Sequence, residues 1–388
     1  MENRFLINRI VSNHQSIISN QNIMKIGIYS LPFHCNYGGI LQSYALHIVL
    51  KRMGHNIYVL NKNWIDHPGK RDMMVMLKCV IVNFLFRRKE YSKRQILLES
   101  ISELKRFWTS NICNLYDFKI HNEIKSIGLD TIIVGSDQIW RKGYCKDTLF
   151  YFLKFAKSWN IRRIAYAASF GVSEWQFDNQ TTNEMKSLLQ LFKGVSVRES
   201  DAKSLCEQYF NISPVHVLDP TLLIGKEEYS KFRINSKQKR KKQFVSFMLH
   251  PNIEKKMLSK KVADKLGAEV IDIDVPLNSM VNNKIVKYKS VEEWLSALLD
   301  ADYVLTDSYH GMVFAINFNK QFVTLGNVQG GQSRFVSLLN LFNLSNRMTK
   351  DEDEIINLMN EDINWVEVNT ILEEKRTKSI SFLKNALG

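Results

Sequence analysis

Cysteine, proline and glycine are scarce in this chain of 388 residues, and each shortage argues against a class of protein. Cys35, Cys79, Cys113, Cys145 and Cys206 are scattered without a CxxC pair, which favours reduced cytoplasmic thiols over a disulfide framework or a zinc site. The 17 glycines and 6 prolines are fewer than average usage predicts, so low-complexity and collagen-like segments are excluded.

Long apolar stretches are missing as well. Residues 1–23 lack the continuous apolar core of a secretory signal peptide, so we expect a cytoplasmic protein with an N-terminal extension of unassigned role. The most hydrophobic run, Met73 to Phe86, is interrupted by Lys78 and is shorter than the roughly twenty residues of a membrane-spanning helix. A transmembrane helix is therefore not expected.

Positive charge, by contrast, is abundant. The chain has 53 lysines and arginines against 39 acidic residues, a net charge of +14, and its 45% hydrophobic content is that of a globular protein. Such a charge favours anionic partners. No helix-turn-helix, RNA-recognition or finger pattern accompanies it, so nucleic-acid binding is not expected.

Part of this charge lies between Lys70 and Arg106, where ten basic and four acidic residues give a net charge of +6 around the apolar run. A basic, apolar helix can lie on an anionic membrane surface. Burial of the apolar part in the core, with a solvated basic end, explains the pattern equally well. The sequence leaves both interpretations open.

Strands and helices alternate through most of the chain. KIGIYS, a glycine turn, the helical LQSYALHIVLKRMG and the strand HNIYVLN form one βαβ unit, and similar units follow until a basic stretch at 226–242. We predict two Rossmann-like, doubly wound α/β domains, residues 24–225 and 243–388, the second ending in a helix. The basic stretch is the predicted linker, and a cleft is expected between the domains.

Ligands of open α/β sheets lie beyond the carboxyl ends of the strands, so the residues that follow each strand are the candidates for a site. After the first strand, Asn36, Tyr37, Gly38 and Gly39, with Gln42 on the next helix, suit an anion such as phosphate or carboxylate. A tight turn that merely requires glycine is the alternative. The turn has no GxGxxG pattern, so dinucleotide binding is not expected.

The segment VGSDQIW follows a later strand. Asp137, next to Ser136, is placed to accept hydrogen bonds or protons from sugar hydroxyls, and Trp140 is placed to stack on a sugar ring. A helix cap and a core tryptophan are equally good interpretations.

The next two strands end in AASFG, which contains Ser169, and in SVRES, which contains Arg198. An arginine at a strand end can hold a phosphate or carboxylate with two parallel hydrogen bonds. A salt bridge from Arg198 to Glu199 or Asp201 is the alternative. Asp219, in the following DPT turn, is assigned no more than a turn.

TDSYHG, residues 306–311, is the strongest local signal. His310 is expected at the N-terminus of a helix, where the dipole favours a neutral ring that can accept a proton, with Asp307 and Ser308 nearby. A structural histidine is the alternative. Downstream, Arg334 follows two glycines and is a weaker candidate for binding an anion.

Taken in order, NYGGILQSYAL, VGSDQIW, YAASFG, SVRES, LDPTLL and TDSYHG resemble the polysaccharide pyruvyl transferase family from Met24 to about Arg334. The resemblance implies a two-domain fold like that of the B-type glycosyltransferases. It also implies transfer of pyruvate from phosphoenolpyruvate onto a sugar as a cyclic ketal, in the synthesis of a surface polysaccharide such as an exopolysaccharide or capsule. A lipid-linked oligosaccharide is the acceptor of some relatives.

The same resemblance places the family's histidine on His310 and its arginine on Arg198. Several relatives have an arginine where this chain has Ser308, and Arg334 or Lys320 is the expected replacement. We expect His310 to act as general acid and base, Asp137 or Asp307 to orient hydroxyls, and arginines and helix N-termini to hold the donor. No metal or cofactor is expected. A nucleotide-sugar glycosyltransferase of the same architecture is the rival prediction.

Overall fold

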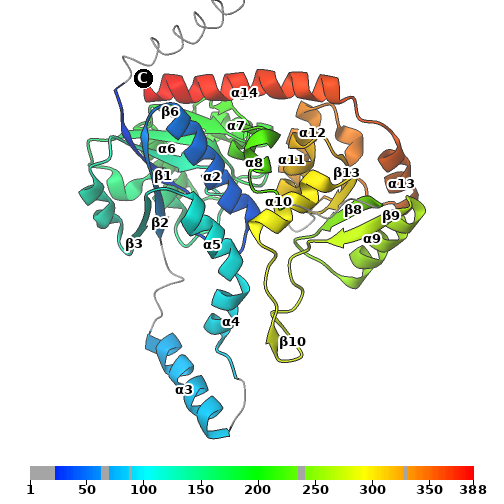
Figure 1. Cartoon of the computed structure of the whole chain (residues 1–388). Coiled ribbons are helices and arrows are strands. Elements are labelled where there is room, and N and C mark those ends of the chain that lie inside the picture. The colour runs from blue at the N-terminus through cyan, green and yellow to red at the C-terminus, as the bar shows by residue number, and fades with distance from the viewer. Residues whose placement is uncertain (1–21, 63–69, 87–89, 235–240, 327–330) are drawn as a thin grey trace, which may run out of the picture.

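The computed structural model describes residues 22–62, 70–86, 90–234, 241–326 and 331–388. The predicted N-terminal extension, residues 1–23, lies outside this part of the chain except for its last two residues. Two parallel sheets flanked by helices make up the body of the molecule (Figure 1).

The first sheet contains seven strands in the order β3-β2-β1-β4-β5-β6-β7, all parallel. Its central strands are apolar and buried on both faces, as parallel sheets covered by helices require. The strands are β1 (Lys25–Tyr29), β2 (Asn56–Lys62), β3 (Leu115–Phe118), β4 (Thr131–Gly135), β5 (Arg162–Ala168), β6 (Gly194–Val197) and β7 (Val215–His216).

The helices of this half connect its strands or extend from it. They are α2 (Tyr37–Arg52), α3 (Lys70–Phe86), α4 (Lys93–Ser100), α5 (Ser102–Asn111), α6 (Asn179–Leu189), α7 (Ser200–Phe210) and α8 (Lys226–Ser230), with short 3₁₀ turns at His121–Ile127, Thr148–Phe152, Lys154–Ala156 and Pro220–Leu222.

The second sheet has the order β13-β12-β8-β9, again all parallel. Its strands are β8 (Lys242–Phe247), β9 (Ala268–Asp272), β12 (Tyr303–Thr306) and β13 (Gln321–Thr324), and a separate hairpin pairs β10 (Met280–Val281) with β11 (Lys284–Ile285). The helices are α9 (Ile253–Lys265), α10 (Val291–Asp300), α11 (Tyr309–Asn317), α12 (Gln332–Leu341), α13 (Glu352–Asn360) and α14 (Trp365–Leu387), and a 3₁₀ turn covers Ser345–Arg347. Among all the helices described here, none is both long and apolar enough to cross a membrane.

Both sheets confirm the predicted α/β class. In each one the strand order reverses beside its first strand, between β1 and β4 in the first sheet and between β8 and β12 in the second. These reversals are the places where open α/β sheets bind ligands. The segments that leave the four strands therefore define where a site is expected.

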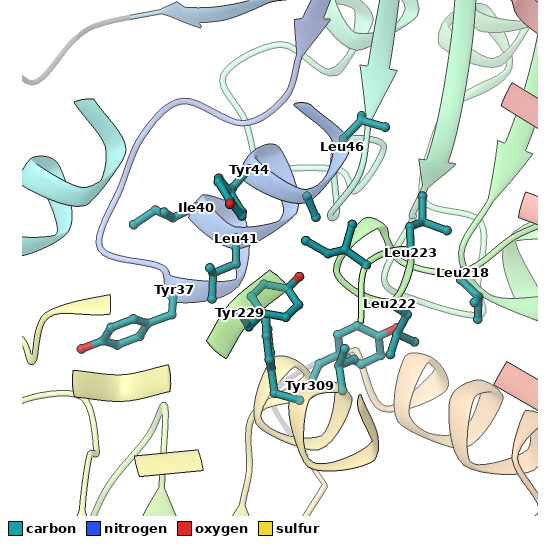
Figure 2. Packing of buried hydrophobic residues seen from close by; sticks show 14 of the residues in the cluster. Tyr37, Ile40, Leu41, Tyr44, Leu46, Leu218, Leu222, Leu223, Tyr229 and Tyr309 are labelled. Carbon is teal, nitrogen blue, oxygen red and sulfur yellow. The ribbon is translucent and has the colours of Figure 1, made fainter. Parts of the chain in front are cut away.

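The two halves share one hydrophobic core instead of meeting across an open gap. Tyr37 of α2 stacks on Trp294 of α10 with ring centroids 5.2 Å apart, and its hydroxyl donates to Lys289 O at 2.7 Å. Side chains of α2, of the 218–223 turn and of α8 point into this core together with Tyr309 of α11 (Figure 2). The position of α11 relative to the first sheet is thus fixed by apolar packing.

Two segments differ from the domain boundaries expected from the sequence. Residues 226–230 of the predicted linker form α8, whose Tyr229 is buried, and Lys242 already begins β8, while 235–240 lie outside the described residues. The final helix, α14, runs across both halves (Figure 1) and packs on the first one, where Ser379 Oγ accepts a hydrogen bond from Leu218 N at 3.0 Å. Long-range packing of this kind leaves no signal in the local pattern.

Candidate functional site

An ion-pair network joins the strand ends of the first sheet. Arg198, directly after β6, donates from Nη1 to Asp219 Oδ2 at 2.7 Å, and its Nη2 lies 3.5 Å from Asp137 Oδ1. All three side chains are buried. Burial alone would raise the pKa of Asp219, but the interactions with His310 and Arg198 outweigh it and hold this pKa well below its usual range.

Asp219 also connects the two halves of the molecule. Its Oδ1 accepts hydrogen bonds from Thr221 N at 3.0 Å and from Thr221 Oγ1 at 2.7 Å. Its Oδ2 accepts a hydrogen bond from Gln42 Nε2 on α2 and lies 3.7 Å from His310 Nε2 on α11. One buried carboxylate therefore contacts a helix from each half.

The N-terminus of α11 holds His310 against α2. Ser308 caps α11 by accepting a hydrogen bond from Gly311 N at 3.3 Å, and His310 is the second helical residue. On the facing helix, a Cβ added at Gly38 would overlap the imidazole of His310. Glycine at position 38 thus allows the two helices to approach each other, a role different from the predicted anion-binding turn.

Two arginines flank Tyr309. The guanidinium carbons of Arg198 and Arg334 lie 4.7 Å and 5.1 Å from the centroid of its ring. Arg334 Nη1 is 3.9 Å from Asp137 Oδ1, and burial, together with the nearby charge of Arg198, lowers the pKa of Arg334. Asp137 therefore lies between two guanidinium groups, and Arg198 has Asp219 and Glu199 as further counter-charges, at 2.7 Å and 3.8 Å.

The backbone around Asp137 is unusual. Asp137 has φ +69° and Ala167, in the adjacent strand, has φ +52°, both in the left-handed region that residues other than glycine rarely adopt. Ala167 lies where the register between β5 and β6 shifts. Backbone conformations of this kind persist only where the surroundings fix them, and they are frequent at functional sites.

Arg198, Arg334, Glu199, His310, Asp137 and Asp219 form one charged cluster. Several of its buried polar atoms lack a hydrogen-bond partner among the described residues. They are Nε and Nη2 of Arg198, Nε of Arg334, Oε2 of Glu199 and Nε2 of His310. Burial raises the pKa of Glu199, and the charge of Arg198 offsets only part of that effect. Buried polar groups are normally paired, so a place where several of them lack a partner is suited to a polar ligand.

A cavity of about 560 Å³ adjoins the cluster through Asp137. This volume lies within the range of small-molecule sites. Aromatic rings form much of its wall, and two lysines and a histidine contribute positive or polar groups. Among the lining residues are Tyr29, Phe33, His34, Asn36, Gly39, Lys62, Trp108, Asp137, Tyr144, Lys146, Phe150 and Tyr151. All of them belong to the first half of the chain.

Two predicted site residues lie elsewhere. Trp140 has no exposed surface, stacks on Phe152 at 4.9 Å and donates from Nε1 to Tyr151 O at 3.3 Å, so the prediction that it stacks on a sugar is wrong. Asp307 accepts hydrogen bonds from Leu249 N at 2.6 Å and Lys255 Nζ at 2.6 Å, which directs its carboxylate away from hydroxyl groups of a substrate beside His310.

The remaining predicted residues divide into two groups. Asn36 and Gly39 line the cavity, and Gln42 contacts Asp219. Tyr37, Ser136 and Ser308 are buried in structural positions: for example, Ser136 Oγ donates to Ala167 O at 3.3 Å. Ser169 is also buried, but its Oγ has no hydrogen-bond partner among the described residues. Lys320 is held by the carbonyls of Leu299 and Ala301, which leaves Arg334 as the arginine that reaches the cluster.

Asp219 is the residue that reasoning from the sequence missed. Its DPT context predicted only a turn, and indeed Pro220 begins a 3₁₀ turn there. A signal was present nonetheless, because LDPTLL stood in the series of strand-end motifs. Its carboxylate is the group that Arg198, Gln42 and His310 all approach.

Comparison with known families identifies the group to which these motifs belong. The pattern of the polysaccharide pyruvyl transferase family matches residues 36–328, about three quarters of the sequence. The chain belongs to this family. The match includes Asp137, Arg198, Asp219 and His310, and it ends shortly before Arg334.

The solved structures that this chain resembles are distant from it in sequence. A putative UDP-N-acetylglucosamine 2-epimerase from Listeria monocytogenes has 9% identity and a TM-score of 0.50, with 93% of this chain and 91% of that chain covered. The UDP-GlcNAc 2-epimerase of Neisseria meningitidis has 12% identity and a TM-score of 0.49, with 94% and 99% covered. No curated protein matches the chain. This pyruvyl transferase family member thus has the two-domain fold of the B-type glycosyltransferases.

Proposed function

We propose that this pyruvyl transferase family member moves the pyruvyl group of phosphoenolpyruvate onto two hydroxyls of a sugar in a polysaccharide precursor. The product is a cyclic ketal, and phosphate is released. The observation that carries the proposal is the meeting of His310, Asp137 and two buried arginines beside an aromatic cavity. Membership in the family supports pyruvyl transfer in polysaccharide synthesis, and the five free cysteines support a cytoplasmic location.

The donor is assigned to the arginine side of the site. Phosphoenolpyruvate carries a phosphate and a carboxylate, and both need fixed positive charge. Arg334 and Arg198 supply it on the two sides of Tyr309, and Arg334 takes the role that an arginine at position 308 has in several relatives. Arg198 is held in place by Asp219, so its orientation is set before substrate binds.

The acceptor sugar is assigned to the adjoining cavity. Sugars bind aromatic faces through their C–H groups and bind carboxylates and amides through their hydroxyls. Tyr144, Phe150 and Trp108 offer such rings, and Asn36 and Asp137 offer such polar groups. Asp137 lies at the boundary of cavity and cluster, where a hydroxyl must meet C2 of the donor.

Two hydroxyl protons must move in this reaction, and we assign the first transfer, from the attacking hydroxyl to C3, to His310. A proton is added to C3 of the enol while one sugar hydroxyl bonds to C2 and loses its own proton. The C2–O bond to phosphate then breaks, and a second hydroxyl bonds to C2, losing its proton to the departing phosphate. The two hydroxyl protons thus end on the new methyl group and on phosphate. Asp137 orients the attacking hydroxyls, and Asp219 keeps the imidazole in position.

Titration calorimetry with phosphoenolpyruvate tests the donor without knowledge of the acceptor. We expect saturable binding that an Arg334→Ala variant weakens at least about tenfold, as the loss of a charge-assisted contact implies. UDP-N-acetylglucosamine serves as the second titrant, because a nucleotide-sugar glycosyltransferase is the rival of the same fold. Binding of the UDP-sugar without binding of phosphoenolpyruvate would favour the rival.

Turnover then tests the role of His310. With phosphoenolpyruvate and a panel of methyl hexosides, we expect phosphate release and a gain in sugar mass equal to pyruvic acid less water. A His310→Gln variant should lose at least about a hundredfold in turnover and keep its affinity for phosphoenolpyruvate. A folded His310→Gln enzyme with near-normal turnover would remove His310 from the mechanism.

A further inference from the structure

Helix α3 exposes an apolar face that the proposed reaction does not use. Large apolar side chains at positions 73, 74, 77, 80, 81 and 85 recur at helical spacing, so they form a single stripe along one side. Met74, Leu77 and Leu85 are 65%, 61% and 64% exposed. On the opposite side, Cys79 is buried and Met76 is partly buried. The apolar stripe therefore faces away from the protein.

The stripe is not part of the protein interior. None of the three core clusters formed by the described residues includes a side chain of α3, whereas the following helices contribute Leu97, Leu98 and Phe107 to the main core. Figure 1 shows α3 standing clear of the body of the molecule, with α4 and α5 leading back to it. Burial in the core, one of the two interpretations of the Met73 to Phe86 run, is thus wrong for the large apolar side chains of this run that the structure describes as exposed.

The charge of this region favours an anionic surface. Within α3 there are three basic residues and one acidic residue, and residues 70–106 together have ten basic and four acidic residues. Lys78 is exposed next to the apolar stripe, so its stem can lie along apolar material with the ammonium group in the headgroup region. A protein partner requires no such positive charge, whereas anionic lipids attract it.

We propose that α3 lies in the surface of an anionic membrane, with its apolar stripe in the acyl boundary and Lys78 among the headgroups. A helix of 17 residues extends for about 25 Å, which suits a helix lying along the interface. Single exposed apolar residues are common on soluble proteins, but a continuous exposed stripe marks an interaction surface.

The position of α3 along the chain suits a membrane contact near the cavity. Lys62, the last residue of β2, lines the aromatic cavity, and α3 is the next element of the chain. In Figure 1 the carboxyl end of β2 and α3 lie on the same side of the molecule. A membrane bound by α3 would then face the side on which the cavity lies, as a lipid-linked acceptor requires. The membrane contact itself does not depend on the proposed reaction.

Sedimentation with vesicles tests the contact on the full chain without any substrate. We expect the protein to pellet at low salt with vesicles of equal parts phosphatidylcholine and phosphatidylglycerol, and to remain mostly in the supernatant with phosphatidylcholine alone. Added salt should release it, because the charge contribution is screened. Inorganic phosphate at the same ionic strength should release no more protein than chloride does, since a lipid surface and not a free anion is bound.

A triple variant, Met74→Ser, Leu77→Ser and Ile81→Ser, should bind these vesicles at least about tenfold more weakly, since it removes apolar area from the interface. Its thermal unfolding should match that of the wild type because the three side chains are exposed. The matched control is Ile253→Ser with Val366→Ser, two positions that are even more exposed, at 75% and 79%, but lie outside α3. This control should bind like the wild type.

Three results would overturn the proposal. The first is a protein that stays in the supernatant with anionic vesicles at low salt. The second is equal binding by the wild type and the triple variant. The third is self-association in velocity sedimentation that the triple variant abolishes in the absence of vesicle binding, because α3 would then be a contact between copies of the chain.

Discussion

Asp137 and Asp307 occupy corresponding places in the two halves of the molecule, yet their surroundings differ. Each one follows a central strand of its sheet at a point where the strand order reverses. Asp137 lies 3.5 Å from Arg198 and 3.9 Å from Arg334, and it lines the cavity. Asp307 is satisfied by two backbone N–H groups after β8 and by Lys255.

The difference is the reason why we assign the reaction to the strand ends of the first sheet, which His310 and Arg334 reach from the second half. On the first sheet, the strand ends gather charged groups whose hydrogen-bonding capacity is only partly used. On the second sheet, the aspartate fixes the loop after β8, and His310 and Arg334 are the groups of this half that reach across to the cluster. The position of a carboxylate at a strand end therefore does not by itself decide whether it belongs to a site or only stabilises the fold.

Removal of charge from the network should have the largest effect on stability. In an Asp219→Asn variant, the buried guanidinium of Arg198 loses its nearest counter-charge, which should reduce the free energy of unfolding by about 3 to 5 kcal/mol. Asp307→Asn should cost less, about 1 to 3 kcal/mol, because one of its two backbone donors still finds the amide oxygen and Lys255 is partly exposed.

Urea unfolding of the two variants measures this difference. The exposed pair of Arg106 with Glu103 offers a baseline, since Glu103→Gln should change the free energy of unfolding by less than about 1 kcal/mol. If Asp219→Asn proved no more destabilising than Glu103→Gln, the network would not be the link that the structure indicates.

Activity should distinguish Asp137 from Asp307, because only Asp137 is assigned a role in the reaction. Asp137→Asn should lower turnover by roughly a hundredfold, because the acceptor hydroxyls lose the group that orients them. Asp307→Asn, assayed at a temperature where it is fully folded, should retain turnover within about threefold, since its carboxylate only shapes a loop. Similar losses in both variants would restore Asp307 to the site.

Much of the fold follows from patterns that are local in sequence. Apolar runs alternating with helical periodicity specify parallel strands, and the carboxyl ends of such strands gather at one edge. For this reason the sequence predicts Asp137, Arg198 and His310 at strand ends, and the structure brings the three into one cluster around Asp219. The sequence also predicts that a helix begins near His310, because serine, here Ser308, is a favoured N-cap residue.

Contacts between distant segments were not predictable in the same way. Whether Trp140 faces a sugar or the core depends on Phe152 and Tyr151, which lie in 3₁₀ turns without clear periodicity. The role of Asp219 depends on α2 and α11, each about a hundred or more residues away. The return of α14 to the first sheet is set by packing that its own sequence does not encode.

The approach of α2 to α11 offers a finer test of how the halves cooperate. Gly38→Ala places a methyl group where the His310 imidazole lies, so the ring must shift and turnover should fall by about tenfold or more. The neighbouring Gly39→Ala is a matched control, because its Cβ would meet Asn36 Nδ2 at 3.6 Å, an ordinary contact. Equal turnover in the two variants, measured at saturating phosphoenolpyruvate, would show that the close approach does not position His310.

The smallest expected effect concerns the pH dependence of the unfolding free energy, which tests the charge of Asp219 separately from its hydrogen bonds. Since its pKa is lower in the folded protein than in the unfolded chain, the unfolded chain takes up a proton first as the solution becomes acidic. The stabilisation is complete above the unfolded pKa, about 4, and decreases below it by up to about 1.4 kcal/mol per pH unit. The Asp219→Asn variant lacks this proton uptake. The difference in unfolding free energy between the wild type and the variant should therefore become smaller from pH 5 to pH 3.

The wild type must be compared with the variant at each pH, because Glu199 changes the unfolding free energy with pH in the opposite direction to Asp219. Its raised pKa means that the folded protein binds this proton more readily than the unfolded chain, so mild acidification stabilises the fold through Glu199. Glu199 is present in both proteins, and its contribution largely cancels in the difference between them. Urea unfolding at each pH measures the difference in unfolding free energy between the wild type and Asp219→Asn. If this difference stays constant down to pH 3, Asp219 is not held ionised by Arg198 and His310. The network would then owe its stability to hydrogen bonds and packing more than to charge.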